Sequence, residues 1–225
     1  MATDAVTNSA RAEVLRRIRA GIGGASDSVA AQVGWEGIAR EYRRSGRRER
    51  SEVLQLLEER LRDYDARVVR VSSDSVVQSV DELLAERGVR RIVMPVGLPV
   101  AWLPASSGES GVEFVADEEL SAAELDGVDG VMTGATLAIA ETGTVVLQNV
   151  AGQGRRATTL VPDYHLCVVD TKDVVETVPE AMARLQETAA LATTFVSGPS
   201  ATADIEMTRI KGVHGPRFLD VILIV

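Results

Sequence analysis

The stretch VVRVSSDSVVQSVDELLAERGVRRIVM, residues 68–94, decides the fold class, because it carries two strand patterns on either side of a helix pattern. Val68–Val71 and Arg91–Met94 are short apolar runs typical of buried strands. Between them, Asp74 or Ser75 starts a helix that continues through Leu84, and Gly88 is a typical C-cap. This order predicts parallel strands with the helix on one face of their sheet.

The same alternation extends on both sides of this stretch. Val112–Val115 is typical of a third strand, residues 118–125 of a short helix, and Phe218–Val225 of a final strand that places the C-terminus in the sheet. Before the first strand, Ser51 caps a helix with apolar residues at helical spacing, namely Val53, Leu54, Leu57 and Leu61. We therefore expect an α/β fold with helices on the faces of a partly parallel sheet.

The segment between Val128 and Val169 departs from this alternation, because it has strand patterns and glycine turns but no good helix pattern. Leu137–Ala140 and Val145–Gln148 flank a tight turn and predict a hairpin in which Gly143 takes a positive φ. We expect this block, including a strand at residues 165–169, to form an antiparallel insertion or layer on the α/β body.

The N-terminal region is expected to form an arm. Asn8 or Ser9 can cap an amphipathic helix, and glycines after it start a flexible stretch to about Gly34. An arginine-dense connector follows, and it is either a solvated loop or a patch that docks an anion or a partner; its arginines are Arg43, Arg44, Arg47, Arg48 and Arg50. The sequence thus divides into an arm and connector, residues 1–48, and an α/β domain, residues 49–225.

Composition excludes several classes of protein. The chain has 225 residues, 45% of them hydrophobic, and a net charge of −9. Its single cysteine, Cys167, excludes a disulfide framework and a four-cysteine zinc or iron–sulfur site, and it favours the reducing cytoplasm. The acidic body argues against nucleic acid as the principal partner. No apolar stretch has the length of a membrane span, and the N-terminus lacks a signal-peptide pattern.

The Ser197–Asp204 segment is the first candidate for chemistry. A helix from Pro179 to about Ala190 and a buried strand at Thr194–Val196 precede it, and we expect a second helix after its Gly-Pro-Ser turn. Backbone N–H groups of such a turn, with the helix dipole, bind anions. The candidate ligand-binding residues here are Gly198, Ser200, Thr202, Asp204 and Glu206. Plain helix capping is the alternative.

The Glu141–Thr144 hairpin turn is the second candidate. Glu141 can act as a nucleophile or base beside threonine hydroxyls and a glycine that allows close approach. A similar turn lies just upstream, so both can line one pocket; the candidate ligand-binding residues are Thr133, Gly134, Thr136, Thr142, Gly143 and Thr144. The alternative is a pair of structural β-turns.

Three basic residues complete the candidate set. Arg156 can clamp a carboxylate or phosphate through a forked hydrogen bond. His165 and His214 can shuttle protons, or they can be a strand-end and a turn residue with structural hydrogen bonds. A chain with two histidines cannot build a three-histidine metal site, and we expect no metal.

In order and spacing these segments resemble the lactate utilization protein C family, which carries the LUD domain. The resembling pieces are Thr133–Thr136, Ala140–Thr144, Leu160–His165, Ser197–Glu206 and Gly212–Pro216. The resemblance implies a three-layer α/β sandwich with a mixed sheet, similar to the sugar-phosphate isomerase and CoA-transferase superfamily. It also implies bacterial oxidation of L-lactate to pyruvate together with two iron–sulfur partner proteins. Catalytic glutamates in that superfamily make Glu141 the first candidate for a reactive carboxylate.

Three functions stay open at this point. The chain can be a non-redox component of a lactate-oxidising complex that binds a small carboxylate or phosphate. It can be a free-standing enzyme acting on a sugar phosphate or acyl-CoA through Glu141. It can also be a non-catalytic scaffold that docks iron–sulfur subunits through its N-terminal region. We expect no cofactor in this chain, and the sequence leaves the oligomeric state open, a homo-oligomer included.

Overall fold

The computed structural model describes residues 3–21, 28–105, 111–202, 210–211 and 214–225, which form two compact units. The first unit, Met1–Tyr42, contains helices α1 (Thr3–Gly21) and α2 (Ser28–Glu36). Helix α1 starts well before Asn8, so the expected cap at Asn8 or Ser9 is wrong. The expected flexible stretch to Gly34 is also wrong from Ser28 onward, because that part forms α2.

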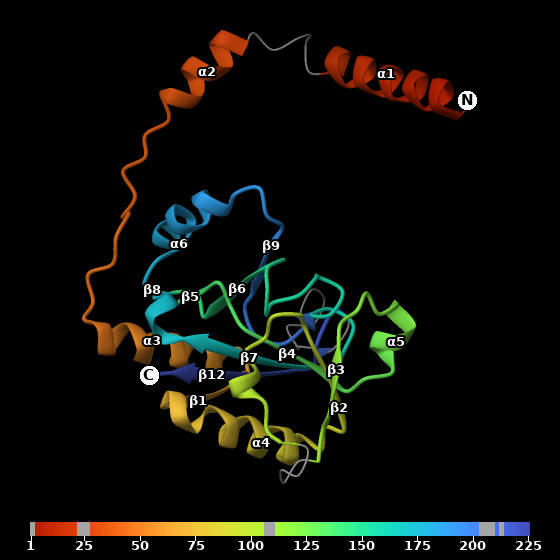
Figure 1. The fold of residues 1–225 in the computed structure, drawn as a ribbon. Coiled ribbons are helices and arrows are strands. Elements are labelled where there is room, and N and C mark those ends of the chain that lie inside the picture. Colours follow the sequence, from red (N-terminus) through yellow and green to blue (C-terminus); the bar gives the residue numbers. More distant parts are fainter. Residues whose placement is uncertain (1–2, 22–27, 106–110, 203–209, 212–213) are drawn as a thin grey trace. The chain divides into compact units, whose positions relative to one another are not determined.

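The second unit, Arg43–Val225, is built on a six-stranded sheet. Its order is β1-β12-β7-β4-β2-β3, and every neighbouring pair is parallel. The strands are β1 (Arg67–Val71), β2 (Arg91–Met94), β3 (Glu113–Ala116), β4 (Gly130–Thr133), β7 (Tyr164–Asp170) and β12 (Phe218–Ile224). The predicted C-terminal strand is confirmed, and it lies inside the sheet between β1 and β7 (Figure 1).

A second, four-stranded sheet holds the predicted hairpin. Its order is β8-β5-β6-β9, with strands β5 (Leu137–Ile139), β6 (Thr144–Gln148), β8 (Val174–Val175) and β9 (Thr193–Val196). Strands β5 and β6 are antiparallel and Gly143 has a φ of 56°, as predicted. The expected antiparallel block is wrong for its outer strands, because β4 and β7 pair in the parallel sheet.

Helices α3 (Arg50–Asp63), α4 (Val76–Arg87), α5 (Ala122–Asp126) and α6 (Val178–Leu185) complete the body. Glu49 precedes α3 as its N-cap, so the predicted cap at Ser51 is two residues late. Helix α4 ends at Gly88, whose φ of 66° confirms the predicted C-cap. Short 3₁₀ turns occur at Ser73–Ser75, Val100–Trp102, Thr171–Asp173 and Gln186–Thr188.

The core explains the layers seen in Figure 1. Helix α4 packs its buried valines and leucines against one face of the parallel sheet. Helix α3 and the inner face of the four-stranded sheet cover the other face, and α6 covers the outer face of the four-stranded sheet. The predicted α/β architecture, with helices on the sheets and both parallel and antiparallel strand pairs, is therefore confirmed. Hydrophobic burial in these clusters is the main driving force that stabilises the two sheets. The edges of these sheets carry the site.

Two predictions near the C-terminus are wrong. Strand β9 is an edge strand with half of Phe195 exposed, not a buried strand. After the Gly-Pro-Ser turn, Ala201–Thr202 form strand β10, which pairs antiparallel with β11 (Ile210–Lys211), instead of starting a helix. The Gly-Pro-Ser turn bonds to Pro216 and not to a following helix, because the backbone N–H of Ser200 donates to the Pro216 carbonyl at 2.7 Å.

Candidate functional site

A cavity of about 150 Å³ lies where β7 and β12 of the parallel sheet meet β9 of the four-stranded sheet. A cavity of this volume in other proteins holds a molecule the size of benzene. Its described lining comprises Arg156, Thr159, His165, Phe195, Val196, Ser197, Gly198, Pro199, Ser200, His214, Gly215, Pro216 and Leu219. The structure thus brings together five of the predicted site residues: Arg156, His165, Gly198, Ser200 and His214.

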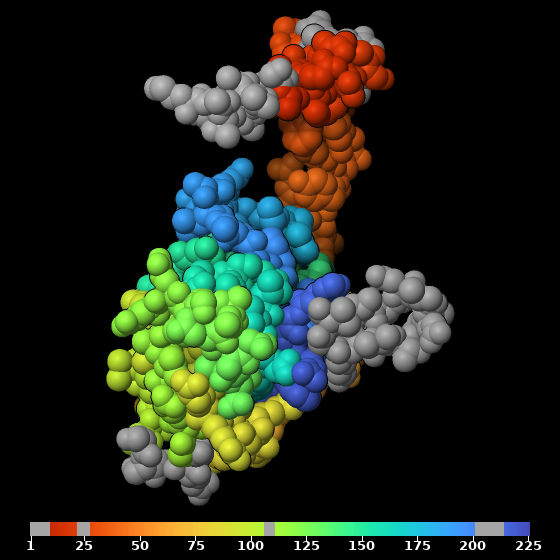
Figure 2. Space-filling model, turned by 90° about the vertical axis from the view of Figure 1, so that its right-hand side faces the viewer, coloured from red at the N-terminus to blue at the C-terminus, as the bar shows by residue number. Residues whose placement is uncertain are grey.

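Strand pairing places these residues side by side. The parallel register of β7 and β12 puts His165 opposite Leu219 on the face toward the four-stranded sheet. The N–H of His214 donates to Oγ of Ser200 at 3.1 Å and ties the two loops at the rim together. In the space-filling view, teal residues around 155–165 adjoin dark blue residues near the C-terminus (Figure 2).

Arg156 gives the cavity its positive charge. Its Nη1 donates to Oγ1 of Thr159 at 3.1 Å, which fixes one edge of the guanidinium. None of the described lining residues is acidic, although the chain as a whole carries a net charge of −9. A guanidinium that pairs with no carboxylate among the described residues, beside a serine hydroxyl, suits a small carboxylate or phosphate.

His165 lies at the floor of the cavity, with only 1% of its surface exposed. Its Nε2 is 2.8 Å from Oγ1 of Thr133, a residue on the neighbouring strand β4. Burial, with the nearby charge of Arg156, lowers the pKa of His165 to about 4. The ring is therefore neutral at pH 7, so His165 adds no charge to the cavity.

The two predicted glycine segments lie next to each other, and both contact the end of helix α3. Val145 of β6 pairs with Val196 of β9, and the Oγ atoms of Thr144 and Ser197 are 2.7 Å apart just beyond that pair. A Cβ on Gly143 would lie 2.7 Å from Cβ of Arg60, and one on Gly198 would clash with Tyr64. The close approach that both glycines permit is therefore an approach of the end of α3 and not of a ligand.

Glu141 does not occur among the described residues that line the cavity. Its carboxylate pairs with Arg43, and Nη1 of Arg48 lies 3.7 Å away. Both arginines also bind the buried Glu176, at 3.0 Å and 2.7 Å. Glu141 therefore holds the connector to the body, and its catalytic role stays a prediction that this placement does not support.

The other predicted residues surround the site or lie outside the described part. The hydroxyl of Thr133 contacts the ring of His165. The hydroxyls of Thr142, Thr144 and Ser197 lie in a row, each within hydrogen-bond distance of the next. Thr136 donates to Gln153 at 2.9 Å, and the N–H of Gly134 donates to the Gly152 carbonyl, so both support the strand end. Thr202 lies in β10. Asp204 and Glu206 lie outside the described residues.

Sequence reasoning missed Thr159 and the apolar wall. Thr159 lies three residues after Arg156 and holds its guanidinium, and a hydroxyl residue at that spacing was the available signal. The wall of Phe195, Val196 and Leu219 comes from two different sheets, so no local pattern predicts it. In the described part of the chain, no three His, Cys, Asp or Glu side chains gather in a way that could share a metal ion.

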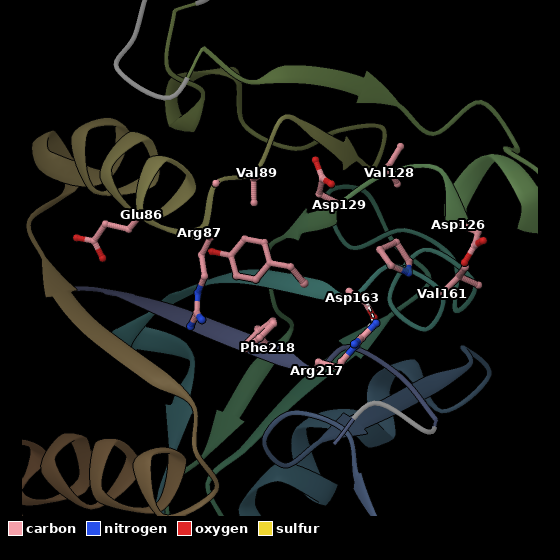
Figure 3. A pocket seen from close by; sticks show the side chains of 13 residues that line it. Glu86, Arg87, Val89, Asp126, Val128, Asp129, Val161, Asp163, Arg217 and Phe218 are labelled. Carbon is pink, nitrogen blue, oxygen red and sulfur yellow. Dashed lines mark hydrogen bonds and ion pairs between the residues drawn. The ribbon is translucent and has the colours of Figure 1, made fainter. Parts of the chain in front are cut away.

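A second cavity, of about 510 Å³, lies on the opposite face of the parallel sheet, below the end of α4 (Figure 3). Its cations already have carboxylate partners. Arg87 binds the buried Asp220 through two hydrogen bonds, and Arg217 points toward Asp163 and binds it at 2.9 Å and 2.6 Å. This cavity is consequently less suited to an anion than the one at Arg156.

Comparison with known proteins places these features in a family. The family model described as the LUD domain matches residues 54–224. A lactate utilization protein C from Deinococcus radiodurans is 43% identical over 180 residues, which cover 78% of this chain and 81% of that protein. One from Shouchella clausii is 27% identical over 217 residues, covering 84% and 91%.

A solved structure supports the same fold. The crystal structure of a DUF162 family protein from Deinococcus radiodurans is 37% identical and superposes with a TM-score of 0.69. The match covers 80% of this chain and all of that one. In this chain, none of the helices that the structure describes is both long enough and apolar enough to cross a membrane.

Proposed function

Because the chain belongs to the LUD domain family, we propose that it is a component of a lactate utilization system that binds a small carboxylate ion. The name of its relatives supports the role in lactate utilization. The cavity at Arg156 supports the ligand class, because it presents a guanidinium and hydroxyl donors and has no acidic residue in its described lining.

The volume of the cavity favours this proposal over a free-standing enzyme for acyl-CoA. About 150 Å³ suits an ion of three or so carbons, whereas pockets for larger ligands span roughly 300–1,000 Å³. The Phe195, Val196 and Leu219 wall suits a methyl group. The pairing of Glu141 with two arginines also disfavours the free-standing enzyme, whose chemistry depends on a reactive Glu141.

We assign the redox step of lactate oxidation to partner proteins that carry iron–sulfur clusters. Oxidation of lactate to pyruvate releases electrons that need an acceptor. A cluster needs several thiolates, and this chain has one cysteine, Cys167, buried in β7. Three of the connector arginines, Arg43, Arg48 and Arg50, bind residues of their own body, which disfavours the alternative that this segment serves mainly to dock a partner.

Growth on L-lactate tests this function in the native organism. Deletion of the gene should abolish growth on L-lactate and leave growth on glucose intact. Complementation with Arg156→Gln should fail, while Arg217→Gln, which changes a paired arginine of the second cavity, should restore growth. Normal growth of the deletion strain on L-lactate would refute the role, and full rescue by Arg156→Gln would refute the carboxylate site.

A further inference from the structure

Two neighbouring arginines, Arg155 and Arg156, share one turn but differ in what their side chains bind. Nε and Nη2 of Arg155 bind the two carboxylate oxygens of Asp117 at 2.9 Å and 2.8 Å, and Nη2 also binds the Leu120 carbonyl. Nε and Nη2 of Arg156 form no hydrogen bond or ion pair with any residue that the structure describes. Arg155 therefore fixes the turn to the body, and Arg156 keeps the same two donors available.

Thr159 binds the remaining nitrogen of the Arg156 guanidinium. Nη1 donates to Oγ1 of Thr159 at 3.1 Å and to its carbonyl oxygen at 3.4 Å, and the same hydroxyl donates to the Arg156 carbonyl at 3.3 Å. A guanidinium can only donate and a carbonyl can only accept, so the direction of each of these bonds is fixed. Thr159 is buried, which gives its hydroxyl little freedom to move. The guanidinium is thus held at Nη1, on the side away from its free Nε and Nη2 donors.

The Nε–Nη2 edge is the edge through which other arginines of this chain bind carboxylates. Arg87 binds the buried Asp220 through Nε at 3.1 Å and Nη2 at 2.5 Å, and Arg217 binds Asp163 through the same two atoms. Two parallel N–H donors match the two oxygens of one carboxylate. Arg156 has the same fork of donors but no carboxylate partner among the described residues.

The Arg156 guanidinium lies beside the cavity. Arg156 lines it, and so does Thr159, the residue that binds Nη1. His165 lines the same cavity, and its pKa is lowered by burial and by the nearby charge of Arg156. The charged group is therefore close to two different walls of the cavity, on strand β7 and on the turn after Arg155.

We propose that Thr159 is a positioning residue, which holds Nη1 so that Arg156 presents its Nε–Nη2 edge to the carboxylate of the ligand. This inference rests on the proposed carboxylate site. It adds that the site recognises the two coplanar oxygens of a carboxylate and not only its negative charge. Arg156→Lys would keep the charge and lose the fork. Loss of the Thr159 hydroxyl would leave the guanidinium to be ordered only when the ligand binds, which weakens binding.

Titration calorimetry of the full chain with L-lactate separates charge from geometry. Arg156→Lys should weaken binding about tenfold, the value of one hydrogen bond to a charged group. Thr159→Val should weaken binding about threefold to tenfold, because one long side chain must then be immobilised on binding. Thr159→Ser returns the hydroxyl and should bind L-lactate within about twofold of the wild type.

Thr158→Val is the matched control for Thr159→Val. Thr158 is also buried, also lies three residues after an arginine, and also donates to the carbonyl of that arginine, Arg155, at 2.7 Å. Among the described residues, its hydroxyl contacts no guanidinium. Thr158→Val therefore removes the same kind of local hydrogen bond without releasing Arg156, and it should change the affinity for L-lactate by less than about twofold.

NMR of the arginine side chains tests the positioning without a ligand. A guanidinium that is held at Nη1 rotates slowly about its Nε–Cζ bond, so Nη1 and Nη2 of Arg156 should give separate signals in the wild type. The spectrum of Arg156→Lys identifies these signals by their loss. They should merge in Thr159→Val and stay separate in Thr158→Val.

The outcomes separate this inference from the proposed function. Equal affinity of the wild type and Arg156→Lys for L-lactate would leave the carboxylate site standing and overturn recognition through the fork. Equal effects of Thr159→Val and Thr158→Val on affinity, or merged Arg156 signals in the wild type, would overturn the positioning role of Thr159. Failure of the wild type to bind L-lactate would refute the carboxylate site and this inference together.

Discussion

Glu176 shows how one buried carboxylate can organise a basic segment. Its side chain is 3% exposed, and Oε2 accepts the backbone N–H groups of Arg47 and Arg48 at 2.7 Å and 2.9 Å. Burial alone would raise the pKa of Glu176, but these N–H groups and the Arg48 guanidinium outweigh it and hold the pKa below its ordinary value. Gly46 passes so close that a Cβ there would clash with this carboxylate.

Glu176→Gln should destabilise the body by about 2–3 kcal/mol, because it removes a charged acceptor and leaves several donors underpaired. Since the folded pKa is lowered, the contribution of Glu176 is fully present above its unfolded pKa of about 4.3 and is lost as pH falls through the folded pKa. Urea denaturation at pH 7 should show the full difference between variant and wild type, and the difference should shrink below about pH 4.

Glu187→Gln is the control for this experiment, because Glu187 is exposed near the end of α6. It should change the free energy of unfolding by no more than about 0.5 kcal/mol. An effect of Glu176→Gln as small as that of the control would contradict the proposed role of Glu176.

At the scale of elements, the end of α3 determines how the hairpin and the Gly198 turn are placed. Gly143 needs both a positive φ and the absence of a Cβ, since Arg60 fills the space beside it. Gly88 has a similar positive φ of 66°, but nothing lies within 4 Å of the position of its Cβ. Substitutions at these two glycines therefore separate the energetic cost of backbone strain from the cost of close packing.

Gly88→Ala should destabilise the protein by about 1 kcal/mol, the cost of a left-handed residue with a Cβ. Gly143→Ala should cost about 1–3 kcal/mol more, because α3 must also move away from the hairpin. Urea denaturation of both variants measures the difference. Equal destabilisation would show that α3 does not press on the hairpin as closely as the structure indicates.

Local pattern predicted those elements whose ends carry clear signals. Gly88 after α4, the Glu141–Gly143 turn and the alternating strands can all be predicted from local sequence without knowledge of their pairing partners. The assignment of β4 and β7 to the parallel sheet depends on pairing across the chain, which no local pattern contains. Ala201–Thr202 has a cap-like sequence, yet pairing with Ile210–Lys211 makes it a strand.

The site was only partly predictable for the same reason. Arg156, His165, Gly198, Ser200 and His214 were chosen as chemical types, and the fold brings them to one cavity. Glu141 was chosen by the same argument, but the arginines that bind it come from a segment about a hundred residues earlier in the chain. A pairing over that separation depends on how the connector lies across the four-stranded sheet.

At the scale of the whole molecule, the boundary between the two units explains what the connector does. The second unit begins at Arg43, and no buried core cluster among the described residues includes a residue before Val53. The LUD match likewise starts at residue 54. The body therefore needs the connector for its ion pairs and not for its core.

Two truncated chains distinguish the contribution of residues 1–42 to stability from that of the connector residues 43–48. A chain of residues 43–225 should unfold at the same urea concentration as the full chain. A chain of residues 49–225 should be less stable by about 3 kcal/mol, because the buried Glu176 loses Arg43, Arg48 and two backbone donors. Equal stability of the two truncated chains would contradict the anchoring role of residues 43–48.

Direct binding of L-lactate tests the central claim. Titration calorimetry of the full chain should show one lactate ion bound per chain. Arg156→Gln should weaken that binding about 10-fold to 100-fold, the value of hydrogen bonds to a charged group, whereas Arg217→Gln should leave it unchanged. Binding of equal strength by wild type and Arg156→Gln, or the absence of binding to the wild type, would contradict the claim that the cavity between β7, β12 and β9 is a carboxylate site.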